Sequence, residues 1–404
     1  MIDLEVPRKL APLVAQARQV ADEVFRPISR KYDREEHARP KELDMLAAVI
    51  DGMNDGSDLG GAGATGVRRS ANGAGADGNR NGANLSTALS VMELCRGDVG
   101  LLLSVPRQGL GNSAIASVAD DEQLARYAGR WAAMAITEPE AGSDSAAIRT
   151  TAVLDGDEYV LNGEKIYVTA GERAHLVVVW ATLDRTKGRA AIKSFVVERS
   201  NPGLVLDRLE HKLGIRASDT AAFRLEDCRV PREDLLGPPG IEVTNGFAGA
   251  MQTFDNTRPL VAAMAVGLTR ACLDETRRLL RDAGVEVDWD RPAAVQTAAA
   301  AEHLAMDADY EAAYLLTLQA AWMADNGKPN SLQASMAKAK AGRTCVDVAL
   351  RCVRLGGALG YGEDLLLEKW ARDAKILDIF EGTQQIQLLI VARQLLGLSS
   401  VQLR

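Results

Sequence analysis

Apolar and polar residues follow three successive patterns along this chain. Between residues 7 and 50, apolar side chains recur at steps of three and four, which predicts amphipathic helices. Residues 51–84 are rich in Gly, Asn and Asp and predict a long loop. The helical pattern returns from about Leu85 to Ala128. We therefore expect an N-terminal all-α domain over residues 1–128.

A β pattern covers the middle of the chain. From Ala132 onward, short runs rich in β-branched residues are divided by turn residues, which is typical of strands. These runs are EYVLNGEKIYV, HLVVVWATL, KSFVVER and TAAFRLEDCRV. Asn162-Gly163 matches a common hairpin turn sequence. We expect a middle β domain over residues 129–240, built as a barrel or a sandwich.

The helical pattern resumes after Pro238-Pro239 and continues to the last residues. Gly and Pro residues separate the candidate helices. The candidates lie near residues 243–283, 292–325, 331–354, 363–378 and 384–396. We expect a C-terminal α-bundle domain over residues 241–404, and hence a multidomain α+β fold.

Composition narrows the class of protein. The 404 residues are 47% hydrophobic and 25% charged, with a formal net charge of −8, which is ordinary for a globular protein of two or three domains. No stripe of Lys and Arg suggests nucleic-acid binding, and no stretch of ~18 apolar residues suggests a membrane span. The first residues, MIDLEVPRKL, do not resemble a signal or transit peptide, so we expect a cytoplasmic protein.

Cysteine and histidine are sparse and scattered. The five cysteines form no CxxC pair and are expected to be buried, reduced thiols. A metal site needs clustered ligands, and the four histidines stand apart in the sequence, so we expect no metal site. The four histidines are His37, His175, His211 and His303.

Two segments of the β pattern carry groups suited to a cofactor. In ITEPEAGSD, residues 136–144, a strand end runs into a turn whose backbone N–H groups and hydroxyls could cradle an anion or a cofactor. Tyr167 and Thr169 lie two apart in a predicted strand, so they share a face that could hold a flat heterocycle. An ordinary capped turn and an ordinary strand explain the same residues. No GxGxxG follows a predicted strand and no GxxxxGK[ST] is present, which argues against a Rossmann or P-loop nucleotide site.

Two further polar positions stand beside apolar runs of the helical part. Asp255 and Arg258, in FDNTRPLVAAMAVG, could hold a polar ligand tail, or could be a capping Asp and a surface Arg. Glu381, in IFEGTQQIQ, follows apolar residues and precedes Gly382 and Thr383. Taken alone, Glu381 could simply open the next helix, where the helix dipole favours a carboxylate.

In their order along the chain, these segments resemble one family, the acyl-CoA dehydrogenases. The resemblance covers nearly the whole chain. The segments that carry it are PISRKYD, ITEPEAGSD, LNGEKIYVTAG, KLGIRASDT, CRVPREDLLG, FDNTRPLVAAMAVG and RDAKILDIFEGTQQIQ. It implies a helical N-terminal domain, a central β domain and a C-terminal four-helix bundle. It also implies FAD-dependent oxidation of an acyl-CoA thioester to trans-2-enoyl-CoA, a reaction of fatty acid β-oxidation, with an electron-transfer flavoprotein as acceptor.

The resemblance assigns roles to individual residues. Glu381 matches the base that removes the α-proton, and its backbone N–H is expected to bind the thioester oxygen. One branch of the family places its base immediately before the residue that matches Arg258, and Thr257 occupies that position here. The implied cofactor-binding residues are Met134, Ile136, Thr137, Gly142, Ser143, Tyr167, Thr169, Gln296, Thr383 and Gln385. The implied substrate-binding residues are Ser143, Phe254, Asp255, Arg258 and Gly382.

Two elements of the family pattern are missing. Family members usually carry an Arg-x-x-Phe-Gly element that reaches the FAD site of a neighbouring subunit. Counting back from Gln296, Val285 stands at the Arg position and Asp288 at the Phe position. A Gln that is usual shortly before Gly-Gly is replaced by Val353. We therefore expect a hetero-tetramer in which a paralogous subunit supplies these groups. The alternative is a homotetramer in which Arg281 or Arg291 compensates.

The sequence leaves several functions open. An acyl-CoA oxidase, a flavin monooxygenase or a mainly structural subunit could share this fold, although a monooxygenase would not need Glu381. A DNA-associated relative is disfavoured because no basic patch is visible. The apolar start of VGLLLSVPRQGLG, residues 99–111, fits either an acyl tail or plain core packing. Acyl chain length cannot be derived from these residues.

Overall fold

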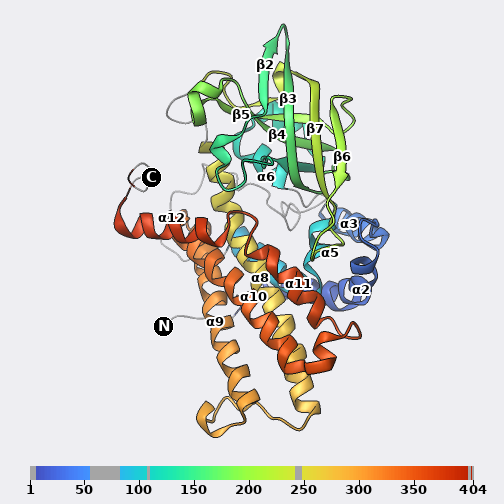
Figure 1. Ribbon diagram of the computed structural model, residues 1–404, viewed down its shortest axis with the longest axis vertical. Coiled ribbons are helices and arrows are strands. Elements are labelled where there is room, and N and C mark those ends of the chain that lie inside the picture. The colour runs from blue at the N-terminus through green and yellow to red at the C-terminus, as the bar shows by residue number, and fades with distance from the viewer. Residues whose placement is uncertain (1–5, 55–81, 107–109, 242–247, 399–401, 403–404) are drawn as a thin grey trace.

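Helical bodies lie below and beside a β body in the computed structural model of the protein (Figure 1). The structure describes residues 6–54, 82–106, 110–241, 248–398 and 402, and within them the side chains of 48–54 and 248–256 are not described. The mixed α+β fold predicted from the sequence is confirmed, with helices first, a sheet in the middle and helices last.

The N-terminal body is helical, as its three- and four-residue periodicity predicted. A π-helical turn at Ala21–Phe25 joins the first two helices. Most of the glycine-rich segment lies outside the described residues, although α3 and α4 overlap its two ends. The helices are α1 Ala11–Val20, α2 Arg26–Arg34, α3 Lys41–Asn54, α4 Ala83–Gly97, α5 Val99–Ser104, α6 Leu110–Val118 and α7 Asp121–Arg126.

One eight-stranded sheet forms the middle body, in the order β6-β7-β3-β2-β4-β5-β8, with β1 parallel to β4. Buried side chains of these strands form two apolar clusters, one on each side of the sheet. One lies among the strands themselves, and the other is shared with α6. The strands are β1 Ala132–Ala135, β2 Thr151–Asp155, β3 Glu158–Thr169, β4 Leu176–Thr182, β5 Ile192–Glu198, β6 Leu204–Leu209, β7 Thr220–Pro231 and β8 Leu235–Leu236. The run LVVVWAT of β4 is buried at every position, as a central strand requires.

The predicted hairpin turn at Asn162-Gly163 is wrong. Both residues lie inside β3, and the turn between β2 and β3 falls at Gly156-Asp157, since Asp155 pairs with Glu158. The β3–β7 register shifts at Gly163, where a Cβ would come within 2.5 Å of the Thr150 hydroxyl. Glycine is therefore needed at 163 for a close approach at a β-bulge, and not for a turn.

The C-terminal helices pack as a bundle and share a core with the N-terminal ones. They are α8 Ala248–Asp282, α9 Ala298–Asp325, α10 Ser331–Tyr361, α11 Leu367–Leu377 and α12 Gln384–Leu396. Helix α10 continues beyond its predicted end, through a kink at Gly357. Buried residues from α4, α8, α10 and α11 belong to one apolar cluster. The two helical regions thus fold as one body, and the β body lies at one end of it (Figure 1).

Two expectations about side chains and membranes can be checked on the described residues. All five cysteines are buried and none forms a disulfide, as predicted. None of the described helices combines the length and the hydropathy that crossing a membrane would need.

Candidate active site

Glu381 lies in the turn that connects α11 to α12. Its backbone is left-handed, with φ 57°, and the next residue, Gly382, also has a positive φ of 89°. Thr383 caps α12, because its hydroxyl accepts a hydrogen bond from the Ile386 N–H. Since α12 begins at Gln384, Glu381 precedes the cap. The alternative of a glutamate in the first turn of a helix is therefore wrong.

Buried polar side chains hold the backbone of this turn. Lys338, from α10, donates to the carbonyl of Gly382 at 2.7 Å. Gln387, from α12, donates to the carbonyls of Glu381 at 2.9 Å and Gly382 at 3.2 Å. A left-handed non-glycine residue costs free energy and persists only where its surroundings fix it. Neither support could be predicted from the sequence, because no local pattern marks Lys338 or Gln387 as buried and directed at this turn.

The Glu381 carboxylate faces the start of α8. Thr257 donates a hydrogen bond to Glu381 Oε2 at 2.7 Å. The two positions at which the family resemblance allows a base, 257 and 381, are therefore in direct contact. Burial raises the pKa of Glu381, while the Thr257 hydrogen bond and the charges of Arg258 and Lys338 act to lower it. The balance is a raised pKa, which gives the carboxylate a stronger affinity for a proton.

The two predicted cofactor segments of the β body are joined to each other. The carbonyl of Thr137 accepts from the Ile166 N–H at 2.9 Å. The buried Lys165 ammonium donates to the Ile136 carbonyl at 3.1 Å and to Glu138 at 2.7 Å. Glu138 also accepts from the backbone N–H groups of residues 149 and 150. This buried ion pair fixes the turn that follows β1 against β3.

The outer side of this junction carries the groups that were predicted to meet a cofactor. Tyr167 is 63% exposed with φ 57°, and Thr169 is partly buried. Val168, between them, points into the β core, so the other two side chains lie away from it. The register shifts between Lys165 and Val168, so β3 is bulged here and not regular. Gly142 and Ser143 are exposed in the turn, while Met134 is partly buried and Ile136 is buried.

The remaining predicted site residues are spread over the helical part. Arg258 is buried beside Thr257, and Gln385 is exposed in the first turn of α12. The side-chain amide of Gln296 accepts a hydrogen bond from the Asp288 N–H and donates to the carbonyls of Asp288 and Arg291. It therefore stabilises the loop between α8 and α9. The side chains of Phe254 and Asp255 lie outside the described residues.

The segment KLGIRASDT, to which the sequence assigned no role of its own, joins three parts of the molecule. The Ile215 N–H donates to Asp373 of α11 at 2.5 Å, and the Ala217 carbonyl accepts from Ser104 of α5 at 2.7 Å. The Lys212 N–H donates to Glu36, just after α2, at 2.8 Å. These bonds set the position of the β body against both helical regions, and thereby the position of the β3 face against the Glu381 turn.

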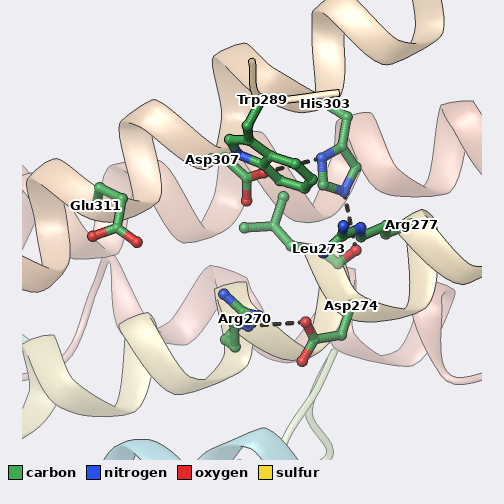
Figure 2. Close-up of a pocket in the computed structure, with 8 residues that line it drawn as sticks. All are labelled: Arg270, Leu273, Asp274, Arg277, Trp289, His303, Asp307 and Glu311. Carbon is green, nitrogen blue, oxygen red and sulfur yellow. Dashed lines mark hydrogen bonds and ion pairs between the residues drawn. The ribbon is translucent and has the colours of Figure 1, made fainter. Parts of the chain in front are cut away.

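A small pocket between α8 and α9 lies apart from this site. Its volume is about 190 Å³, and Figure 2 shows charged side chains around it. Arg277 stacks over Trp289 at 4.1 Å, and His303 bonds to the Leu273 carbonyl at 3.2 Å. Because neither Glu381 nor any predicted flavin residue lines it, we do not assign acyl-CoA to this pocket. The apolar start of residues 99–111 belongs to the main core cluster, which supports plain packing there.

Known proteins match nearly the whole chain. Residues 133–228 match the model of the acyl-CoA dehydrogenase middle domain, and residues 244–396 match that of the acyl-CoA dehydrogenase C-terminal domain. The short-chain specific acyl-CoA dehydrogenase of Clostridium acetobutylicum is 33% identical over 403 residues, which cover 97% of this chain and 99% of that protein.

Solved structures show the same likeness. Butyryl-CoA dehydrogenase from Megasphaera elsdenii superposes with a TM-score of 0.83 at 27% identity, over 98% of this chain and 100% of that one. A chain from a structure concerned with the electron transferring flavoprotein of Acidaminococcus fermentans has a TM-score of 0.83 at 31% identity, over 98% of this chain and 100% of that one.

Proposed function

The chain belongs to the acyl-CoA dehydrogenase family, and we propose that it oxidises the Cα–Cβ bond of an acyl-CoA thioester, with Glu381 as the base. The observation that carries this proposal is the Glu381 turn. It presents a single carboxylate of raised pKa, hydrogen-bonded to Thr257 and held by Lys338 and Gln387.

Each group at the turn has a task in this reaction. The thioester makes the α C–H acidic, and Glu381 takes that proton. Thr257 orients the carboxylate through its hydrogen bond at 2.7 Å. The carbonyls of Glu381 and Gly382 accept hydrogen bonds from Gln387 and Lys338, which hold the backbone of the turn in place. Following the family resemblance, we assign the Glu381 N–H as the donor to the thioester oxygen, where negative charge develops.

The outer face of β3 fits FAD, which in this family accepts the hydride from Cβ. An aromatic ring at Tyr167 that is 63% exposed suits stacking on a flat heterocycle, and Thr137, Thr169 and Ser143 offer hydroxyl donors around it. The exposed turn at Gly142 leaves room for phosphate groups, since a Cβ there would meet nothing within 4 Å. We assign the flavin ring to Met134, Ile136, Thr137, Tyr167 and Thr169, and the adenosine half to Thr383 and Gln385.

The proposed reaction can be tested with the FAD-loaded protein. Since relatives are named short-chain specific and butyryl-CoA dehydrogenases, butyryl-CoA is the first substrate in a series of graded acyl length. Anaerobic mixing should bleach the flavin and yield the trans-2-enoyl-CoA. If no acyl-CoA in the series bleaches the flavin, the proposed function is wrong.

We also infer that an electron-transfer flavoprotein reoxidises the enzyme. The family relation supports this acceptor, as does the likeness to a chain from a structure concerned with such a flavoprotein. Reoxidation should be slow in air and fast when the flavoprotein is added. Rapid reoxidation by oxygen with release of peroxide would instead indicate an acyl-CoA oxidase.

The missing cross-subunit elements lead us to propose a hetero-tetramer with a paralogous subunit. Val285 is apolar and Asp288 is acidic, so neither position offers a cationic side chain. Both take part in local bonds at the end of α8: the Val285 N–H donates to the Leu280 carbonyl, and Asp288 accepts from the Asp290 N–H. Co-purification from the native source with a second, related chain supports this assembly. A homotetramer that carries one FAD per chain when this chain is expressed alone contradicts it.

A further inference from the structure

Two histidines that are far apart in the sequence meet at the joint between the N-terminal helices and the β body. His37 follows α2, and His211 lies in the loop between β6 and β7. Their ring centroids are 5.1 Å apart. Glu36 completes the group, because its Oε2 lies 2.9 Å from His211 Nδ1. The ligand atoms that these three side chains offer all lie within 4.8 Å of one another.

We propose that Glu36, His37 and His211 bind a divalent cation of the zinc type, which joins the end of α2 to the β6–β7 loop. Two imidazole nitrogens and one carboxylate oxygen form a donor set that suits Zn²⁺ and its neighbours Co²⁺ and Ni²⁺. The sequence-based expectation of no metal site treated the histidines as isolated, and the fold brings two of them together.

The His37 ring is positioned to bind a metal ion, and its nitrogens lack the hydrogen bonds that a buried histidine usually makes. Both of its ring nitrogens are buried, and neither has a hydrogen-bond partner. Its backbone is left-handed, with φ 70°, an unfavourable conformation for a non-glycine residue. A cation would satisfy one of the two nitrogens.

The other two ligands are oriented and reachable. Glu36 Oε1 accepts from the Lys212 N–H at 2.8 Å, which leaves Oε2 directed at His211. The ion would replace the hydrogen that His211 and Glu36 share. The His211 side chain is 83% exposed, so it can turn to close the ligand shell, since ligands of a tetrahedral zinc ion lie about 3.3 Å apart. Solvent can supply the fourth ligand.

Nearby charges set the expected strength of this site. Glu172 adds negative potential at His37, and Lys212 adds positive potential. The Lys212 ammonium is bonded to the Ser218 carbonyl at 2.8 Å, and Arg173 donates to the carbonyl of Ala38 at 3.1 Å. These cations make binding weaker than in a purely acidic site. All five cysteines are buried, so thiolates do not offer a competing surface site.

Metal titration of the full chain, purified without a histidine tag and stripped with a chelator, tests the site. We expect one Zn²⁺ per chain by calorimetry, a tetrahedral Co²⁺ difference spectrum, and a zinc-dependent rise in melting temperature. His211→Ala and His37→Ala should each weaken binding at least about tenfold. His175→Asn is the matched control, because His175 is exposed and outside the cluster, and it should bind as the unmodified protein does.

Two results would overturn the site. One is the absence of saturable binding in the unmodified chain. The other is binding that His211→Ala leaves unchanged. Since His211 is exposed and its replacement does not disturb the core, a loss of binding in His211→Ala cannot be ascribed to misfolding. The titration does not depend on catalysis, so it can succeed or fail independently of the proposed dehydrogenation.

Discussion

Thr257 is the residue that ties the two helical segments of the site together. It lies on α8, and its hydroxyl donates a hydrogen bond to the Glu381 carboxylate, which follows α11. A hydrogen bond to a charged carboxylate stabilises the ionised form and so lowers its pKa. At Glu381 this effect opposes burial, which raises the pKa. Thr257 therefore lowers the pH at which the base becomes active.

The Thr257→Val variant should shift the pH dependence of turnover. Catalysis needs the ionised Glu381, so activity rises as pH rises through the pKa of the base. Removal of the donor raises that pKa, and the acidic limb should move up by about one pH unit. Thr269→Val, on the same helix but bonded to its own helix backbone, is the control and should not move the limb. Identical pH profiles for the two variants would argue against this role of Thr257.

Gly382 is required by its surroundings as well as by its backbone. With φ 89°, an alanine there is strained, and its Cβ would lie 2.4 Å from Gln387 Nε2. We expect Gly382→Ala to lower turnover and to cost about 1–3 kcal/mol in the free energy of unfolding. Gly397→Ala has a similar φ of 66° with nothing within 4 Å, and isolates the backbone contribution. Thermal unfolding of both variants should show the larger loss for Gly382→Ala.

At the scale of elements, α11 positions the site through a buried charge cluster. The Lys369 ammonium lies between Asp373, at 2.6 Å, and Asp98, the N-cap of α5. Asp373 also accepts from the Ile215 N–H of the β6–β7 loop. All three charged side chains are at most 1% exposed. The cluster therefore fixes α11, and with it the Glu381 turn, to α5 and to the β body.

Lys369→Met should destabilise the protein strongly, because it leaves two buried carboxylates without their cation. We expect a loss of about 3–5 kcal/mol in the free energy of unfolding. Lys375→Met, on the same helix, removes a lysine that is 49% exposed and paired with Asp378, and should cost less than about 1 kcal/mol. Chemical denaturation compares the two. Equal stabilities would contradict the structural role of the cluster.

The type of each element could be predicted from periodicity, whereas bulges and the contacts between distant elements could not. The continuous apolar run of β4 and the long helical patterns after Pro238-Pro239 folded as expected. Asn162-Gly163 misled because a glycine at a bulge has the same sequence signature as a glycine at a turn. Lys338 and the pair His37–His211 were missed because their partners lie far away in the sequence. Glu381 was found through the family resemblance, and not through any local pattern.

At the scale of the whole molecule, the loop after α8 is the segment that we expect to contribute groups to the FAD site of a neighbouring subunit. If Val285, Asp288 and Val353 are the lost contacts, restoring them should let the chain bind FAD without a second subunit. We expect the triple variant Val285→Arg, Asp288→Phe and Val353→Gln to raise the FAD content of the chain expressed alone toward one per chain. Val295→Arg, at an exposed valine of the same loop, controls for added charge. Full FAD occupancy of the unmodified chain would show that no such contact is missing.

The most direct test of the central claim is anaerobic rapid mixing of FAD-loaded Glu381→Gln with an acyl-CoA that reduces the unmodified enzyme. Glutamine keeps the shape of the side chain but cannot take the α-proton, so FAD and acyl-CoA should still bind. General acid–base catalysis is worth about 10²–10⁴-fold, and flavin bleaching should slow by at least that factor. Bleaching at a rate close to that of the unmodified enzyme would show that Glu381 is not the base.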